Sequence, residues 1–367
     1  MKKTAVILFL LIGHFLTGVG GAEDTDSVSP GSEALFDAVS FGRYGEAWTL
    51  LQELLSSGSP EERDFSPSQL ATFFTAHALS RALSGKVGGK SEDYPEGLRT
   101  TEAIGFIVEQ ARERRIVILN EEHDNSQSRA FALELLRALH EEGFTVLAAE
   151  TFTDGIGEEA YVSCNSGWYT RDPFFADFVR EAMRLGFKLV PYESRSLDPP
   201  GTLPSDSINR REAEQSEHLF QRTIERYPQE KVFLYVGYSH LSENPVAIRN
   251  TPDGREVEVR WMACRLKDLT GIDPLTIDQT TLTERGEPGD EHPAYRELAK
   301  SISRPGVLLD AEETPQVVGP YRGQADIQVV HPRSMYLRGR ADWMRMGGYR
   351  KEVPVLREWV LPDSDTV

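Results

Sequence analysis

The spacing of hydrophobic positions changes near residue 100. Between residues 33 and 84, apolar side chains recur at the three- and four-residue intervals of a helix, as Leu35, Phe36 and Val39 do. From about Thr101, short apolar runs alternate with longer amphipathic stretches. The pattern predicts a helical N-terminal cap followed by a domain in which strands and helices alternate.

Within residues 101–285 the apolar runs predict strands, and the amphipathic stretches between them predict helices. The strands are expected at Ile116–Leu119, Val146–Ala149, Phe187–Tyr192 and Val232–Val236, and the helices at 125–142, 172–185 and 207–227. Asp124 and Gln127 have the spacing of a capping box, which places the start of the first helix just after Asp124. This alternation predicts an α/β fold with a largely parallel sheet and helices on both faces.

The remaining parts of the chain have weaker patterns. A further strand, added or at the sheet edge, is predicted at Glu256–Leu266. Residues 286–367 are rich in Pro and Gly with short β-like runs, and we expect an irregular, partly β C-terminal extension there.

The first 22 residues have the order of a secretory signal peptide. Lys2 and Lys3 precede an apolar run, and Gly20 and Ala22 are the small residues expected before a cleavage site. Residues 23–100 then form an acidic linker and the cap. We expect an exported protein, periplasmic or secreted, without a stable membrane span after cleavage. An uncleaved membrane anchor is the alternative.

Composition narrows the possible partners. The hydrophobic fraction of 39% suits a globular protein, and a net charge of −18 argues against a general nucleic-acid binder, whose surface is basic. Cys164 and Cys264 are the two cysteines. A disulfide between them and two buried free thiols are both open, and so is the oligomeric state.

Titratable side chains follow each of the predicted strands. Glu121 and His123 come after the first strand, Glu150 after the second, Tyr192 closes the third, and His240 follows the fourth. The carboxyl ends of parallel strands meet at one edge of a sheet, where ligands bind. We therefore expect His123, Glu150 and His240 to converge.

The chemistry of these residues suits a hydrolytic metal centre. Two imidazoles and a carboxylate, from His123, Glu150 and His240, would hold a divalent metal ion and leave a position open for water. Glu121 would then act as general base on that water, and Tyr192 would donate a proton or a hydrogen bond to the developing oxyanion. Without a metal, the same residues would form a general acid/base pair.

Three short motifs carry a resemblance to a known superfamily. "ILNEEHD", "LAAETF" and "LYVGYSHL" resemble the superfamily that groups erythromycin esterases, ChaN-like haem-binding proteins and Tiki/TraB proteins. The resemblance covers about Thr101 to Thr283, and Asn120 stands where the first motif usually has glycine. It implies an α/β fold with its site at the strand ends. Because members include lactone esterases, metal-dependent proteases and haem binders, it implies either a hydrolase acting on a small molecule or peptide, or a haem-binding protein.

Two other interpretations remain. "VFLYVGYSHL" is close to the nucleophile elbow of α/β-hydrolases, with Ser239 as nucleophile and His292 or His331 as base, although Leu241 replaces the final glycine. Haem binding without catalysis is the other. The loop Thr153–Arg171 carries aromatic residues that would cover a flat ligand, namely Tyr161, Trp168 and Tyr169.

Overall fold

The computed structural model describes most of the chain after the predicted signal peptide. Its described residues are 30–56, 67–75, 77–83, 97–199, 201–248, 256–337 and 340–351. The predicted signal peptide at 1–22 lies outside these ranges. Among the described residues, no helix is both long and apolar enough to cross a membrane.

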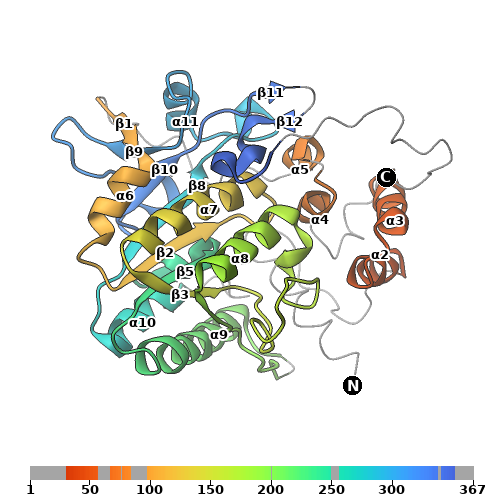
Figure 1. Ribbon diagram of the computed structural model, residues 1–367, viewed down its shortest axis with the longest axis horizontal. Helices are drawn as coiled ribbons and strands as arrows, with labels where there is room; N and C mark the ends of the chain where they lie inside the picture. The colour runs from red at the N-terminus through yellow and green to blue at the C-terminus, as the bar shows by residue number, and fades with distance from the viewer. Residues whose placement is uncertain are drawn as a thin grey trace.

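An eight-stranded sheet forms the centre of the molecule (Figure 1). Its strands, in spatial order, are β1 (Arg99–Glu102), β9 (Gly306–Leu309), β10 (Ile327–Val330), β8 (Leu275–Leu282), β2 (Ile116–Glu121), β5 (Lys231–Gly237), β3 (Phe144–Ala149) and β4 (Lys188–Val190). All pairings from β10 to β4 are parallel, whereas β9 is antiparallel to both of its neighbours. The predicted largely parallel sheet is confirmed.

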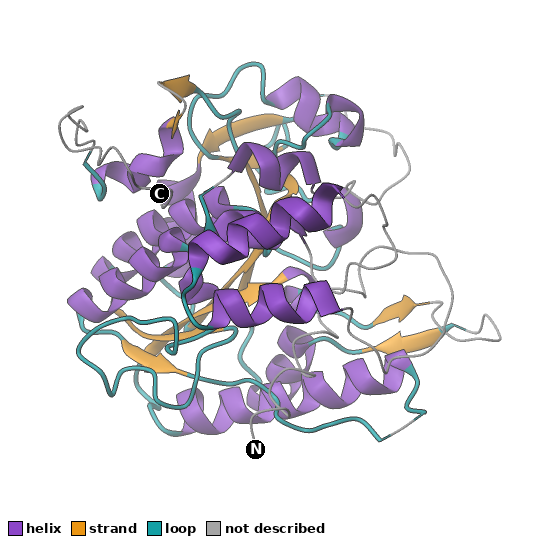
Figure 2. Cartoon of the chain, turned by 90° about the vertical axis from the view of Figure 1, so that its right-hand side faces the viewer, coloured by secondary structure: helices purple, strands orange, loops and turns teal. Residues whose placement is uncertain are grey.

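Alternate residues of the central strands face two separate hydrophobic cores. Val117 and Leu119 of β2 face the core beneath one group of helices, α6 (Ala103–Ala111), α7 (Ser126–Glu141) and α8 (Pro173–Leu185). Ile116 and Ile118 face the core beneath α9 (Pro204–Leu219) and α10 (Met262–Thr270). Helices therefore cover both faces, as predicted, and Figure 2 shows them flanking the strands.

The N-terminal helices pack onto the first of these cores. They are α2 (Pro30–Ser40), α3 (Tyr44–Ser56), α4 (Pro67–Phe73) and α5 (His77–Leu83). Leu35, Leu51 and Leu70 are buried in the core that also contains α7 and α8. Phe73 meets Trp168 edge-on, with ring centroids 5.6 Å apart. The predicted helical cap is present and shares its core with the sheet.

Two local predictions were wrong. The strand expected at Glu256–Leu266 is limited to β7 (Val257–Val259), which pairs only with β6 (Val246–Ile248), and α10 follows from Met262. The helical spacing of Met262, Ala263 and Leu266 prevails over the β-branched run before it. The cap of α7 is Asn125 rather than Asp124, because the Asn125 side chain accepts the hydrogen bond from the Gln127 amide at 3.2 Å.

The C-terminal residues are more closely tied to the sheet than the sequence suggested. Residues 286–367 supply β9 and β10 of the main sheet, besides the two-residue strands β11 (Tyr336–Leu337) and β12 (Arg340–Ala341) and the helix α11 (Pro293–Leu298). The partly β character of this region is confirmed. β8 was missed because its centre, Asp278–Thr281, is polar, yet all of its residues are buried.

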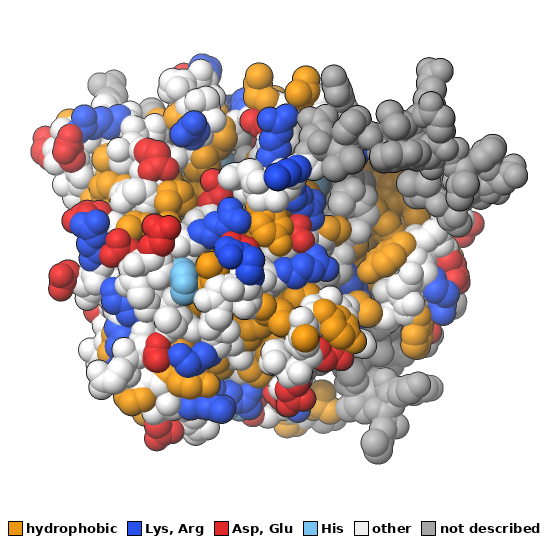
Figure 3. Space-filling view, in the orientation of Figure 1, with side chains coloured by type: hydrophobic (Ala, Val, Ile, Leu, Met, Phe, Trp, Pro, Cys, Tyr) orange, Lys and Arg blue, Asp and Glu red, His pale blue; other side chains and the backbone are white. Residues whose placement is uncertain are grey.

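Short helical turns connect these elements. They are η2 (Tyr169–Arg171), the π-helical turn η3 (Phe220–Glu225), η4 (Tyr238–Leu241), η5 (Pro288–Asp290), η6 (Gly319–Tyr321) and η7 (Asp342–Gly348). On the face of the molecule drawn in Figure 3, acidic and basic side chains are interspersed.

Candidate functional site at the carboxyl edge of the sheet

Gly237, the last residue of β5, lies where three of the predicted site residues meet. A Cβ atom at this position would lie 2.4 Å from Cε1 of His123 and 2.5 Å from Oε2 of Glu150. His240 approaches Glu150 from η4, with its Nε2 3.8 Å from Oε1. Only glycine leaves room for these side chains, and the structure thus brings His123, Glu150 and His240 together.

Glu150 is a buried carboxylate without hydrogen bonds. Its residue is 2% exposed, and neither carboxylate oxygen has a hydrogen-bond partner among the described residues. The 3.8 Å contact with His240 is too long for a hydrogen bond. Leaving a buried carboxylate without hydrogen bonds is costly, so this position is suited to a ligand, a cation or a water.

His240 is oriented by a second carboxylate. Its Nδ1 lies 2.7 Å from Oε2 of Glu212, which also accepts a hydrogen bond from the Met262 amide at 3.0 Å. Burial alone would lower the pKa of His240, but the Glu212 carboxylate outweighs burial and raises it. The Nδ1–H therefore points to Glu212 and leaves Nε2 facing Glu150.

His123 has a similar arrangement. Its Nδ1 lies 3.3 Å from Oε1 of Glu121. Its ring stacks on Tyr169 at 4.8 Å and meets Tyr238 edge-on at 4.8 Å. Each histidine is thus held in place by a carboxylate at Nδ1.

Glu121 does not have the surroundings of a general base. It forms an ion pair with Arg129, at 2.8 and 2.9 Å, and accepts a hydrogen bond from the Tyr235 hydroxyl at 2.8 Å. Burial alone would raise the pKa of Glu121, but the Arg129 guanidinium outweighs burial and lowers it to about 2. The predicted base role does not fit, because the lone pairs are occupied and the carboxylate holds a proton only weakly. Glu121 instead orients His123.

Tyr192 is placed as a neutral hydrogen-bond donor. Its side chain is fully buried, and its hydroxyl has no partner among the described residues. Burial, and then the charge of Glu150, raise the pKa of Tyr192 well above its usual range. The phenol therefore keeps its proton close to Glu150.

Two residues near the centre received less weight or none in the sequence analysis. Tyr169, buried on η2, stacks on His123, and burial followed by the charge of Glu150 raises its pKa. Its only sequence signal was its place among the aromatics of Thr153–Arg171. Glu212 had no signal, because the middle of an amphipathic helix normally places a glutamate on the surface.

Arg211 brings positive charge to the same place. Its Nη2 lies 3.3 Å from Nε2 of His240, and its buried Nε has no partner among the described residues. Burial alone would lower the pKa of Arg211, but Glu212, Glu150 and Glu193 together raise it. A guanidinium with an unused N–H beside the centre is able to bind an anionic or carbonyl oxygen.

The environment of Ser239 does not favour a nucleophile elbow. The strained backbone conformation of this turn belongs to Tyr238, with φ +40°, rather than to Ser239. His331 Nε2 lies 3.1 Å from Gln279 Oε1, and His292 caps α11. Both histidines proposed as its base thus have structural roles.

Two of the three aromatic residues proposed to cover a flat ligand are packed inside the protein. Trp168 and Tyr169 are buried against Phe73 and His123, whereas Tyr161, the third of these aromatic residues, is 64% exposed. Cys164 and Cys264 are both free; Cys264 is buried as the free-thiol alternative expected, whereas Cys164 is half-buried.

Comparisons with known proteins give no family. No family model and no curated protein matches the chain. Among solved structures, the type III effector HopBA1 is 14% identical, with a TM-score of 0.38 over 64% of this chain and 96% of that one. The MARTX toxin effector domain RRSP from Vibrio vulnificus CMCP6 is 17% identical, with a TM-score of 0.36 over 67% of this chain. A structure described as bacterial protein toxins is 15% identical, with a TM-score of 0.37 over 66% of this chain. The chain spans just over half of the last two, 55% and 56%. Likenesses this distant assign neither a family nor an activity.

Proposed function

We propose that the protein is an exported hydrolase of ester, lactone or peptide bonds, with a reaction centre formed by His123, Glu150 and His240. One observation carries the proposal: both oxygens of the buried Glu150 carboxylate lack hydrogen bonds from the described residues, and this side chain lies close to the two histidines. A buried charge left in this state is characteristic of a functional site rather than a structural one.

The donor set is chemically suited to a divalent metal ion. Two imidazoles with carboxylates on Nδ1, together with a free carboxylate, have the outer hydrogen bonds that orient metal ligands. Among the described residues, no three His, Cys, Asp or Glu side chains already lie in the geometry of a metal cluster. A metal bound by His123, Glu150 and His240 would polarise the substrate carbonyl and favour deprotonation of water.

The residues of the chain supply the other parts of the reaction. Glu121 and Glu212 hold the two rings in place, and both make their bonds at Nδ1. The buried phenol of Tyr192 donates a hydrogen bond to the carbonyl oxygen as its negative charge develops. Arg211, with its unused Nε–H, stabilises the same oxygen or a neighbouring anionic group of the substrate.

A metal-free version is favoured by one specific contact. Arg211 Nη2 lies 3.3 Å from the Nε2 of His240 that would have to bind the metal. In this version His123 accepts the proton of a water at Nε2, the hydroxide attacks the carbonyl carbon, and the proton then passes to the leaving group. Glu121 stabilises the imidazolium formed in between.

Metal content and hydrolysis, measured together, test the proposal. We would screen the purified protein against neutral esters, lactones and peptides, then compare His123→Ala, Glu150→Gln and His240→Ala with the surface control Glu109→Gln. The proposal expects each site variant to lose at least about 100-fold in rate and the control to lose none. Chelation that abolishes activity supports the metal version, whereas chelator-resistant activity supports the acid/base version. Full activity in all three site variants would refute the proposed centre.

Export is a separate part of the proposal. It rests on the pattern of residues 1–22 alone. Intact mass of the protein from its host is expected to give a mature N-terminus near Glu23. A chain that retains Met1 would contradict it.

A further inference from the structure

The residue that follows Glu150 has a strained backbone. Thr151 is buried, 3% exposed, and its φ is +67°. A β-branched side chain rarely adopts this left-handed conformation, because its methyl and hydroxyl groups crowd the backbone. Strain of this kind persists only where the surrounding structure enforces it, and it is concentrated at functional sites. The contacts of Thr151 identify what enforces it here.

A hydrogen bond and a tight loop hold Thr151 in this conformation. Its amide donates a hydrogen bond to Oε1 of Glu193 at 2.8 Å. Its carbonyl oxygen lies beside Gly167, where a Cβ atom would approach it to 2.8 Å. Phe152 pairs with the same glycine as an isolated β-bridge. The chain thus reverses directly after the end of β3, and the loop that returns leads into η2.

The hydroxyl of Thr151 supplies a hydrogen bond that the start of η2 needs. The amide of Tyr169, the first residue of η2, has no acceptor within its own helical turn, and Trp168 before it provides no side-chain cap. Thr151 Oγ1 accepts this amide at 3.3 Å, although it lies 18 residues earlier in the chain. Because Tyr169 is buried, an unpaired amide there would be costly, and the hydroxyl therefore fixes where η2 begins.

Tyr169 in turn packs on the reaction centre. Its ring stacks on His123, with centroids 4.8 Å apart and an interplanar angle of 29°. Arg129, the partner of Glu121, lies over the same ring, with its Cζ 5.0 Å from the centroid. The ring of Tyr169 therefore contacts both the imidazole and the guanidinium of the ion pair that orients it.

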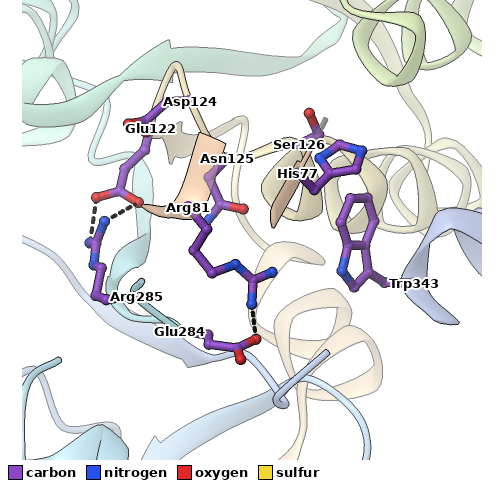
Figure 4. A pocket seen from close by; sticks show the side chains of 9 residues that line it. All are labelled: His77, Arg81, Glu122, Asp124, Asn125, Ser126, Glu284, Arg285 and Trp343. Atoms are coloured by element: carbon purple, nitrogen blue, oxygen red, sulfur yellow. Dashed lines mark hydrogen bonds and ion pairs between the residues drawn. The ribbon is translucent and has the colours of Figure 1, made fainter. Parts of the chain in front are cut away.

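The backbone around His123 is held independently of Tyr169. Glu122, the residue before His123, lines the polar pocket drawn in Figure 4, where it forms a bidentate ion pair with Arg285 at 2.9 and 2.5 Å. The carbonyl oxygen of His123 accepts a hydrogen bond from Arg129 Nη2 at 3.2 Å. A change at Tyr169 is therefore expected to move the imidazole ring of His123 rather than its backbone.

We propose that Thr151 is a positioning residue of the reaction centre, whose hydroxyl holds Tyr169 against His123 and thereby keeps the imidazole oriented for the reaction. Its role in catalysis rests on the proposed function. Glycine would close the same reversal without strain, but it would leave the Tyr169 amide unpaired. The strain at Thr151 therefore accompanies the hydrogen bond that its side chain makes.

NMR spectroscopy of the histidine Cε1–H groups tests the positioning without a substrate. The resonance of His123 is the one missing from His123→Ala, and stacking on Tyr169 displaces it through the ring current. Tyr169→Leu gives its position without the stack. Thr151→Val keeps the branched shape of threonine but lacks the acceptor, and it is expected to move the resonance toward the Tyr169→Leu position. Thr151→Ser keeps the hydroxyl and is expected to leave the resonance near its wild-type position.

Hydrolysis of the substrate found by the screen is the second measurement. Thr151→Val is expected to lower kcat at least about tenfold with little change in KM, whereas Thr151→Ser stays within about threefold of the wild type. Thr153→Val is the matched control, because it removes a hydroxyl of the same loop that bonds the Asn165 carbonyl at 3.0 Å. This control is expected to change neither the His123 resonance nor kcat. A purely structural role for Thr151 would lower the yield of folded protein without lowering kcat selectively.

The outcomes distinguish this inference from the proposed function. A His123 resonance that stays in place in folded Thr151→Val, or that moves equally in Thr151→Ser, overturns the inference. A resonance that moves while kcat is unchanged overturns the role in catalysis. A resonance that moves only in Thr151→Val, combined with hydrolysis that is absent or does not depend on His123, supports the positioning of His123 and counts against the hydrolase centre. Should Thr151→Val fail to fold, Thr151→Gly, which removes the hydroxyl and the strain together, takes its place with the same expectations.

Discussion

Glu150 and Asp278 are both buried carboxylates of the parallel sheet, on opposite sides of β2 and β5, and their surroundings differ completely. Asp278 accepts four hydrogen bonds: from Asn120 Nδ2 at 3.0 Å, from Gln328 Nε2 at 2.8 Å, and from the amide and hydroxyl of Thr280 at 2.9 and 2.8 Å. Glu150 accepts none from the described residues. Burial of a polar group alone therefore does not mark a site. A buried charge left without partners does.

Glu121 resembles Asp278 in that its carboxylate is fully hydrogen-bonded, although it contacts His123. Its carboxylate is filled by Arg129 and Tyr235, and Arg129 is itself fully buried and bonds Asp172 at 2.6 Å. Around β2, the carboxylates of Glu121, Asp172 and Asp278 are therefore all hydrogen-bonded, and we call this network the frame. Beside β3, Glu150 has no hydrogen-bond partner among the described residues. We infer that the frame positions His123 and that Glu150 contacts the substrate.

The largest expected effect on stability comes from removing Arg129, which leaves the buried carboxylate of Glu121 with few hydrogen bonds, as Glu150 has. Arg129→Met removes the guanidinium and leaves Glu121 and Asp172 buried without a counter-ion. We expect the free energy of unfolding to fall by about 3–5 kcal/mol, measured by urea denaturation. Arg112→Met, whose exposed side chain pairs with Glu109 and Glu142 at the surface, is the control and is expected to cost less than about 1 kcal/mol. Equal costs for the two variants would contradict the distinction.

Sequence patterns predicted the central strands, the helices and the meeting of the site residues, but they missed β8. The central strands and helices followed from hydrophobic periodicity, because each strand buries both faces and each helix buries one. The meeting of His123, Glu150 and His240 followed from their places after parallel strands. β8 did not follow, because a polar run such as Asp278–Thr281 is buried only where other strands and turns supply its hydrogen bonds.

The roles of the individual site residues could not be predicted from the sequence either. Glu121 resembled a base in the sequence, since nothing there shows that Arg129, near the start of the next helix α7, pairs with it. Glu212 and Tyr169 come from a mid-helix position and a loop, which carry no signal of their partners. Asn120, the departure from the expected glycine, bonds Asp278 and the Tyr238 carbonyl rather than the centre. Pairing across the fold decides these roles, and it is not local in sequence.

Acid is expected to lower the stability of the protein through His331, which lies where β8 and β10 meet. Burial lowers the pKa of His331 to about 4, below its unfolded value of about 6.5, so the unfolded chain takes up the proton first. Stability is therefore complete above about pH 6.5 and falls as the pH falls toward 4, by roughly 2–3 kcal/mol for this residue. Urea midpoints between pH 7.5 and 4.5 measure the loss. His331→Gln is expected to reduce the slope, and an unchanged slope would contradict the assignment.

A smaller loss of stability is expected when one hydrogen-bond partner of Asp278 is removed. Asn120→Ala removes a donor to Asp278 and the acceptor of the Gln279 amide, which bonds it at 2.8 Å. We expect a loss of about 1–3 kcal/mol in the free energy of unfolding. Asn165→Ala, in an exposed loop, serves as control. If the two variants unfold at the same urea concentration, the Asp278 network is not the support described here.

The smallest effect is expected at Ser239. Ser239→Ala removes a half-buried hydroxyl group, and we expect it to change stability by less than about 0.5 kcal/mol with no change in hydrolysis rate. Hydrolysis is measured on the substrate identified by the screen. A large loss of activity would instead support Ser239 as a nucleophile.

Glu150→Gln tests the central claim most directly, because the same variant reports on stability and on function. In chelator-treated protein we expect the free energy of unfolding to stay level or rise by about 1 kcal/mol, since a buried charge without hydrogen bonds is replaced by a neutral amide. We expect hydrolysis to fall at least about 100-fold. A variant that is destabilised as strongly as Arg129→Met yet keeps its activity would show that Glu150 belongs to the frame, and would contradict the account.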